Sequence, residues 1–351
     1  MSMKDHFIAA SAVAVPPYRI TQEEGEAFLR KHYTSRLSTR SLNIIHQLFS
    51  HPSICARHFA FADPAVLLDE DPDQRIARFN HWAVALSAEA AAKALARAGV
   101  ARSDVSALVV NTCTGYLCPG ISTYLIDELG LKKTTRVYDL VGGGCGGAIP
   151  NLEVCRGLLG MAPEAVVVSI AVEICSCAFQ IKNDLSLLLS NAIFGDGAAA
   201  AVLSNCPPGL ALVSSRSRYA PEYREDVRFI YKEGQLHNQL SPELPQLVAA
   251  TAGQVVDELL TPHDLRVEDV RYWALHSGGE NIINAVKEEL QLTEEQVGGT
   301  RAVLARYGNM SSPTIWFVME ELQNRGLAPG NWLVMLAFGA GLSAHALLAR
   351  T

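Results

Sequence analysis

The stretch SDVSALVVNTCTG, at residues 103–115, has a counterpart 165 residues further along the chain, EDVRYWALHSGG at residues 268–279. Each stretch has an acidic start, a mostly apolar run, and an end of small polar residues. Near-continuous apolar runs are typical of strands whose sheet is covered by helices on both faces. A repeat at a fixed separation indicates two copies of one α/β unit. We therefore predict an internally duplicated, layered α/β fold.

The repeat divides the chain into two expected halves, residues 1–205 and residues 206–351. Carrying the same separation forward from Cys145 leads to Met310, beside Asn309. The loops that follow Asn111 and His276 occupy matching places in the two copies, and so do the turns that contain Cys145 and Asn309. We expect these polar groups to meet at the centre of the molecule, with Cys145 supplied by the first half and His276 and Asn309 by the second.

Composition excludes several classes of function. Of the 351 residues, 49% are hydrophobic and 19% are charged, as in a globular protein. A formal charge of −7, without a basic block interleaved with aromatic residues, argues against a nucleic-acid partner. No apolar run approaches the roughly 20 residues of a membrane span, and we expect a first strand near the N-terminus rather than a signal peptide. Eight cysteines favour free thiols in the cytoplasm, and their spacing does not favour a metal site.

Helical periodicity covers two long segments. The first, residues 81–100, ends near Gly99, and the second, residues 242–260, has Pro242 at a place that suits the first turn of a helix. Residues 217–240 are polar and weakly patterned. We expect this polar segment to join the halves and to border a site.

Cys145 has the most unusual surroundings of the cysteines. The stretch VYDLVGGGCGGAIP, at residues 137–150, places glycines on both sides of it. Glycine lets other groups approach the backbone closely and permits backbone angles that other residues avoid. The pattern predicts a strand, a turn and a helix whose N-terminus lowers the thiol pKa. A thiolate nucleophile is one interpretation, and a small buried hydrophobic residue in a tight turn is the other.

Two more residues are candidates to act with this thiol. His276 follows the second apolar run and precedes two glycines, so a loop could present it as a base. Asn309, in the segment GNMSS, could donate a hydrogen bond to a developing oxyanion. Each also has an ordinary interpretation, because a histidine at a strand end is commonly structural and asparagine is a common turn former.

These motifs together carry a resemblance to a known family. Cys145, HSGG at His276 and YGNMSS at residues 307–312 resemble the Cys-His-Asn triad of type III polyketide synthases, the chalcone synthase-like enzymes of the thiolase fold. IFGDGAAAAVL at residues 193–203 and AFGAGLSAHAL at residues 337–347 are similar to two further family segments. The resemblance implies α-β-α-β-α layers and a homodimer.

The resemblance also implies a reaction. A starter acyl-CoA acylates the cysteine, and the histidine and asparagine hold the malonyl-CoA thioester oxygen while carbon dioxide leaves. Repeated condensation is followed by cyclisation to a pyrone, a resorcinol or a related phenolic product. No metal or organic cofactor is implied, only coenzyme A thioesters as substrates.

The resemblance implies further site residues. Phe194 is similar to a phenylalanine that guards the entry to the cavity, and the alternative is a core aromatic residue before a turn. Cys118 stands where the family reaches into the partner's cavity. Arg57 is a candidate for a coenzyme A phosphate contact, and the alternative is a solvated surface arginine. The expected cavity-lining residues are Cys113, Ala178, Gly234, Gly278, Gly279 and Ser311. The small residues Ala178 and Gly234 favour a roomy cavity and a starter of medium or long chain.

Some features depart from the family, and other functions stay open. Ser277 and Ala340 stand where the family usually has proline, which indicates a divergent, bacterial member. One alternative is a ketoacyl synthase III-like enzyme, which condenses once on a carrier protein. Another is a cysteine-dependent thioester hydrolase, since GGCGG fits a nucleophile elbow. A non-enzymatic alternative is a glycine-rich phosphate cradle, although the chain lacks the ending of a P-loop.

Overall fold

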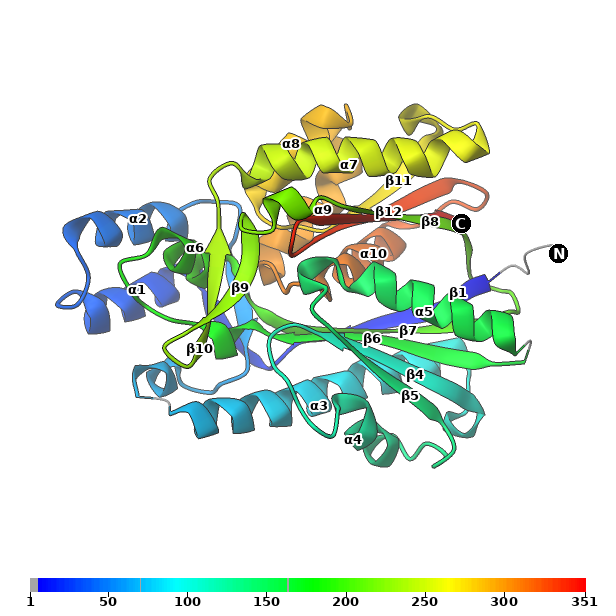
Figure 1. The fold of residues 1–351 in the computed structure, drawn as a ribbon, viewed down its shortest axis with the longest axis horizontal. Helices are drawn as coiled ribbons and strands as arrows, with labels where there is room; N and C mark the ends of the chain where they lie inside the picture. The colour runs from blue at the N-terminus through cyan, green and yellow to red at the C-terminus, as the bar shows by residue number, and fades with distance from the viewer. Residues whose placement is uncertain (1–5, 70, 163) are drawn as a thin grey trace.

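The computed structural model describes residues 6–69, 71–162 and 164–351, which form ten α-helices and thirteen β-strands (Figure 1). The strands are β1 (His6–Ala14), β2 (Tyr18–Thr21), β3 (Ala56–Phe59), β4 (Val105–Thr112), β5 (Arg136–Val141), β6 (Val166–Ile174), β7 (Asp196–Ser204), β8 (Leu210–Tyr219), β9 (Val227–Lys232), β10 (Gln235–Leu240), β11 (Val270–Leu275), β12 (Trp332–Gly339) and β13 (Ser343–Arg350). The helices are α1 (Gln22–Tyr33), α2 (Thr39–Phe49), α3 (Pro72–Ala98), α4 (Ile121–Glu128), α5 (Ala148–Met161), α6 (Leu185–Ile193), α7 (Leu244–Leu260), α8 (Glu280–Glu289), α9 (Glu294–Tyr307) and α10 (Thr314–Arg325).

Nine strands form one sheet whose order is β11-β12-β13-β8-β1-β7-β6-β4-β5. On one side of its centre, β4 pairs parallel with β6, and β6 pairs antiparallel with β7. On the other side, β11 pairs parallel with β12, and β12 pairs antiparallel with β13. The two arms meet at the antiparallel pair β1 and β8. This two-fold pattern matches the repeat in the sequence, since β4 starts at Val105 and β11 starts at Val270.

The strands are buried on both faces because helices cover each side. In β4, Ala107 and Val109 point into one apolar core, and Leu108 and Val110 point into another. The first core contains α5 and α10, which lie between the two arms of the sheet. The outer cores contain α3 on one arm and α7 with α8 on the other (Figure 1). The predicted order of α-β-α-β-α layers is thereby confirmed.

Local sequence explains where the long helices begin and end. Asp71 caps the first turn of α3, and Gly99 ends it with a φ of 65°, which favours glycine. The second long helix, α7, begins at Leu244, so Pro242 lies before it and Pro245 occupies its first turn. The expected place of Pro242 inside the helix was therefore wrong. Proline is tolerated in a first turn because that N–H has no partner within the helix.

The polar segment at residues 217–240 contains the end of β8 and the hairpin of β9 and β10. Its sequence did not predict this hairpin. Among the helices that the described residues form, none is long and apolar enough to cross a membrane.

Candidate active site

Cys145 lies in a short 3₁₀ turn, Gly144–Gly146, between β5 and α5. Gly144 has a φ of 56°, and a Cβ there would lie 2.8 Å from the backbone nitrogen of Ala340. A Cβ on Gly146 would lie 2.9 Å from the nitrogen of Gly339. Since Cβ atoms do not approach other atoms so closely, the glycines around Cys145 let its turn pack directly against the end of β12. Cys145 itself lines a cavity of about 340 Å³, the catalytic cavity below.

His276 directly follows β11 and lines the same cavity. Its backbone N–H donates to the carbonyl of Leu336 at 2.8 Å, which holds the loop against β12. The side chain is 3% exposed, and its Nδ1 has no hydrogen-bond partner among the described residues. Burial lowers the pKa of His276 to about 4. The imidazole is therefore neutral at pH 7 and can accept a proton.

Asn309 lies between α9 and α10, in a segment tied to the end of α6. Its backbone N–H donates to Ile193 at 2.8 Å, and its carbonyl accepts from Gly195 at 2.9 Å. Its Oδ1 accepts from the backbone N–H of Ser311 at 2.7 Å, whereas its Nδ2 donates only a long hydrogen bond, of 3.4 Å, to Gly278. The amide is thus held by its oxygen and keeps N–H groups for a ligand in the cavity.

The pKa of Cys145 differs from the expectation. Burial, with a smaller contribution from the carboxylate of Glu173, raises it to about 12, although the side chain of Ser311 hydrogen-bonds to the thiol. The sequence predicted a lowered pKa from the helix N-terminus. Desolvation of the thiolate outweighs that dipole because the thiol lies deep in the catalytic cavity, surrounded by protein. Cys145 and His276 are therefore both neutral at pH 7.

The sequence reasoning missed Glu173, a fully buried carboxylate at the end of β6. It accepts hydrogen bonds from the backbone N–H of Cys113 at 3.0 Å, the hydroxyl of Thr114 at 2.8 Å and the hydroxyl of Ser312 at 2.8 Å. It also accepts from Ser311, a non-glycine residue with a φ of 59°. A glutamate inside the apolar run VVVSIAVEI was a signal that could have been used. The network fixes the strand ends that face the cavity.

Most of the expected cavity residues come together. Those that line the catalytic cavity with Cys145, His276 and Asn309 are Cys113, Ala178, Phe194, Gly278, Gly279 and Ser311. Two others lie elsewhere. Cys118 is exposed in the loop between β4 and α4, and Gly234 lies in the turn between β9 and β10 with a φ of 73°, outside the lining of this cavity. The hairpin instead contributes Phe229, Asn238 and Leu240, so the polar segment does border the cavity.

Arg57 does not line the catalytic cavity, and it is not a solvated surface residue. It is 2% exposed, its Nε donates to Gln22 at 3.0 Å, and its Nη1 donates to the carbonyls of Asn191 at 2.6 Å and Phe194 at 2.8 Å. Burial lowers its pKa to about 9. The side chain points inward from β3 and fixes the backbone at the end of α6, which accounts for its burial.

Comparison with known proteins identifies the family. Residues 19–222 match the family model described as FAE1/Type III polyketide synthase-like protein, and residues 211–351 match Chalcone and stilbene synthases, C-terminal domain. The chain is 31% identical to a 3,5-dihydroxyphenylacetyl-CoA synthase from Streptomyces toyocaensis, over 94% of this chain and 89% of that protein.

Two solved structures are also similar. PKS-I from the brown alga Ectocarpus siliculosus has a TM-score of 0.91 and 29% identity, with 100% of this chain and 99% of that chain covered. The 1,3,6,8-tetrahydroxynaphthalene synthase from Streptomyces coelicolor A3(2), a bacterial type III polyketide synthase, has a TM-score of 0.89 and 25% identity, with 98% and 99% covered. The two family models together span most of the chain, and the similar structures share its thiolase-like fold. This chain therefore belongs to the type III polyketide synthases, the chalcone synthase-like acyltransferases that form carbon–carbon bonds.

Proposed function

We propose that this enzyme condenses malonyl-CoA repeatedly onto an acyl-CoA starter that is bound as a thioester to Cys145. The observation that carries the proposal is the convergence of three side chains from three separate elements on one cavity. Cys145 supplies a thiol, His276 supplies a neutral imidazole, and Asn309 supplies an amide N–H with only a weak protein acceptor. A nucleophile, a base and a preorganised donor are what this chemistry needs.

In the loading step, Sγ of Cys145 bonds to the thioester carbon of the starter, and the bond from that carbon to the sulfur of coenzyme A breaks. The thiol proton passes to His276 and then to the departing coenzyme A thiolate. Because His276 is neutral at pH 7, a ring nitrogen is available for this proton, and the negative thiolate formed beside it offsets the cost of a buried imidazolium. The imidazolium and the thiolate stabilise one another only while they are paired, which confines the charge separation to the moment of attack.

In the condensation step, malonyl-CoA loses its carboxylate as carbon dioxide, and the electron pair of the broken bond forms an enolate. The negative charge develops on the thioester oxygen, where His276 and Asn309 act as donors. The enolate carbon attacks the acyl thioester, the bond to Cys145 breaks, and the chain leaves extended by two carbons on coenzyme A. These steps use side chains and substrates alone, and we propose no metal or organic cofactor.

The lining of the catalytic cavity and the names of the relatives support a proposal for the starter and the product. The matched relatives are synthases of 3,5-dihydroxyphenylacetyl-CoA and 1,3,6,8-tetrahydroxynaphthalene by name. We propose that this chain likewise cyclises its product, to a pyrone, a resorcinol or a related phenol. The small residue Ala178 in the wall of the 340 Å³ cavity supports a medium or long starter, whereas Gly234 gives no such support.

We further propose a homodimer built from two thiolase-like halves per chain, residues 1–205 and 206–351. Strand β5 is at the edge of the sheet, Val141 at its end is 64% exposed, and Tyr116 in the nearby β4–α4 loop is 73% exposed. An exposed edge with apolar side chains is a surface that pairing with a second copy would cover. Cys118 lies in the same loop, where it could reach a partner's cavity. A cytoplasmic location suits the cysteines, which form no disulfide in the described chain.

Trapping the acyl-enzyme tests the assignment of the nucleophile. The purified full chain is mixed with hexanoyl-CoA, and the adduct is located by peptide mass. We expect one hexanoyl group on Cys145, none in Cys145→Ala, and normal loading in Cys113→Ala, a matched control because Cys113 lines the same cavity. A hexanoyl group on Cys113 in the unmodified enzyme would contradict the proposal.

A further inference from the structure

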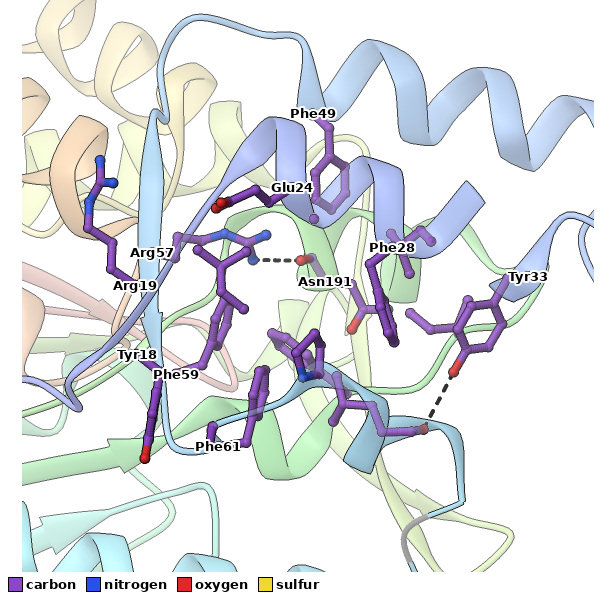
Figure 2. A pocket seen from close by; sticks show the side chains of 18 of the residues that line it. Tyr18, Arg19, Glu24, Phe28, Tyr33, Phe49, Arg57, Phe59, Phe61 and Asn191 are labelled. Atoms are coloured by element: carbon purple, nitrogen blue, oxygen red, sulfur yellow. Dashed lines mark hydrogen bonds between the residues drawn. The ribbon is translucent and has the colours of Figure 1, made fainter. Parts of the chain in front are cut away.

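A second cavity, of about 510 Å³, lies on the other side of the wall formed by Phe179 and α6. Its lining comes from α1, from the end of α2, from β2 and β3, and from the segments around Phe61 and Ile181. Figure 2 shows most of these side chains. Phe179 lines both this second cavity and the catalytic cavity. The condensation chemistry proposed above uses only the catalytic cavity, so the second cavity has no assigned role.

Aromatic rings dominate the lining of the second cavity. They belong to Tyr18, Phe28, Tyr33, Phe49, Phe59, Phe61 and Phe179, which include five of the eleven phenylalanines of the chain. The rings of Phe59 and Phe61 are stacked, with centroids 5.2 Å apart, and Phe179 meets Phe59 edge-on at 5.6 Å. Such walls suit a flat or slender apolar body of small size.

Arg57 supplies a positive charge in the wall of this aromatic cavity (Figure 2). Its guanidinium lies between two rings, 5.4 Å from the centroid of Phe49 and 5.0 Å from that of Phe59. The hydrogen bonds to Gln22, Asn191 and Phe194 use Nε and Nη1. In the part of the chain that the structure describes, Nη2 donates to no acceptor and the guanidinium forms no ion pair. A buried cation with an unused N–H edge is a receptor for an anion.

Nearby carboxylates do not supply an anion to the guanidinium of Arg57. Asp196 is buried, and its oxygens accept hydrogen bonds from the backbone N–H of Ala60 at 2.7 Å and from the N–H and hydroxyl of Ser176 at 2.8 and 2.6 Å. Glu24, at the rim, turns back to accept hydrogen bonds from the backbone and hydroxyl of Thr21 at 2.8 and 3.0 Å. Among the described residues neither acid forms an ion pair with Arg57, and Glu24 uses its Oε2 for the cap of α1, so Nη2 is left for a ligand.

Gly25 keeps the approach to this edge open. A Cβ at Gly25 would lie 3.9 Å from Nη2 of Arg57 and 2.9 Å from Cε1 of Phe49. Glycine inside a helix costs about 1 kcal/mol relative to alanine, so its place in α1 calls for a compensating reason. Close packing against Phe49 is one such reason, and a larger side chain would also come near Nη2 of Arg57.

We propose that the second cavity is a binding site for a small organic acid with an aryl or short alkyl body. Nη2 of Arg57 receives the carboxylate, and the aromatic walls receive the apolar body. The same guanidinium holds the carbonyl of Phe194 through Nη1, so the acid site and the entrance residue of the catalytic cavity share one side chain. The proposal does not depend on the condensation activity.

Isothermal titration of the full chain with 3-phenylpropionate tests this site, with 3-phenylpropanol as the uncharged probe of matched shape. The titration is repeated on enzyme whose Cys145 has been blocked with iodoacetamide, which places a polar amide group beside the nucleophile and narrows the catalytic cavity there. We expect one 3-phenylpropionate per chain before and after blocking, and affinity for 3-phenylpropanol at least 10-fold lower because a charged hydrogen bond is lost.

Two variants fill the cavity from opposite sides. Ile181→Trp and Gly25→Leu should each weaken 3-phenylpropionate at least 10-fold, and Ile76→Trp, on the exposed face of α3, should leave it unchanged. Thermal unfolding identifies a variant that fails to fold, and the binding result of the other, folded variant then decides whether the site is the second cavity. Loss of binding after Cys145 is blocked would place the probe in the catalytic cavity and overturn the proposal. Equal binding of the alcohol, no binding at all, or unchanged binding by a folded Ile181→Trp or Gly25→Leu would overturn it too.

Discussion

Replacing Asn309 by alanine separates decarboxylation from loading. The Nδ2 group of Asn309 has only a 3.4 Å contact with Gly278, so its N–H groups are available to the enolate oxygen. Removing one such donor lowers the rate by about 100-fold to 1000-fold, or roughly 3 to 4 kcal/mol in the barrier. Loading of Cys145 needs the thiol and the imidazole, and it should survive.

The structure adds a second, separable effect of the same substitution. Oδ1 of Asn309 accepts from the backbone N–H of Ser311 at 2.7 Å. Alanine leaves this buried N–H without its acceptor, which costs about 1 to 3 kcal/mol of folding stability. The enzyme should therefore unfold at lower urea concentration while remaining folded at 25 °C.

The assay measures carbon dioxide released from malonyl-CoA, the mass of the acyl-enzyme, and the urea midpoint for each variant. Asn43→Ala, on the exposed face of α2, is the matched control and should change none of the three. Normal release of carbon dioxide by a folded Asn309→Ala enzyme would refute the reasoning, because the segment GNMSS would then be only a turn.

Three further predictions follow from the site. His276→Ala should impair both loading and decarboxylation, and its effect on carbon dioxide release should not add to that of Asn309→Ala, since the two donors hold one oxygen. Burial lowers the pKa of His276 and His345 to about 4, below the ordinary 6.5, so the unfolded state takes up protons first as the pH falls from 6.5 to 4. Lowering the pH from 7 to 5 should therefore reduce the free energy of unfolding by about 2 kcal/mol for each histidine. Urea unfolding at both pH values checks this, and a midpoint that does not change with pH would contradict it. Ala178→Phe should shorten the longest starter accepted in a mass-resolved acyl-CoA panel, whereas Gly234→Ala should leave that limit unchanged because Gly234 lies outside the catalytic cavity.

The parts of the site that sequence could predict are those with a local signature. The glycines around Cys145, the strand end before His276 and the turn at Asn309 are all short-range patterns, and the repeat relates their places in the chain. The layered fold follows from the same repeat, since each copy brings a strand buried on both faces.

The parts that sequence could not predict depend on residues far apart in the chain. Arg57 is buried because its acceptors, the carbonyls of Asn191 and Phe194, lie at the end of α6, well over 100 residues away. The raised pKa of Cys145 depends on burial by the folded chain and on Glu173 from a different strand. Gly234 was assigned to the cavity, but the hairpin that contains it turns that glycine away and points Phe229 inward. Such outcomes are decided by packing between elements, which no local pattern encodes.

The measurement that tests the central claim most directly supplies the full chain with hexanoyl-CoA and ¹³C-labelled malonyl-CoA, without any carrier protein. The account predicts products that carry successive labelled two-carbon units, one carbon dioxide released for each unit, and no such products from Cys145→Ala. Free hexanoate and coenzyme A without carbon dioxide would show a thioester hydrolase and would contradict the account.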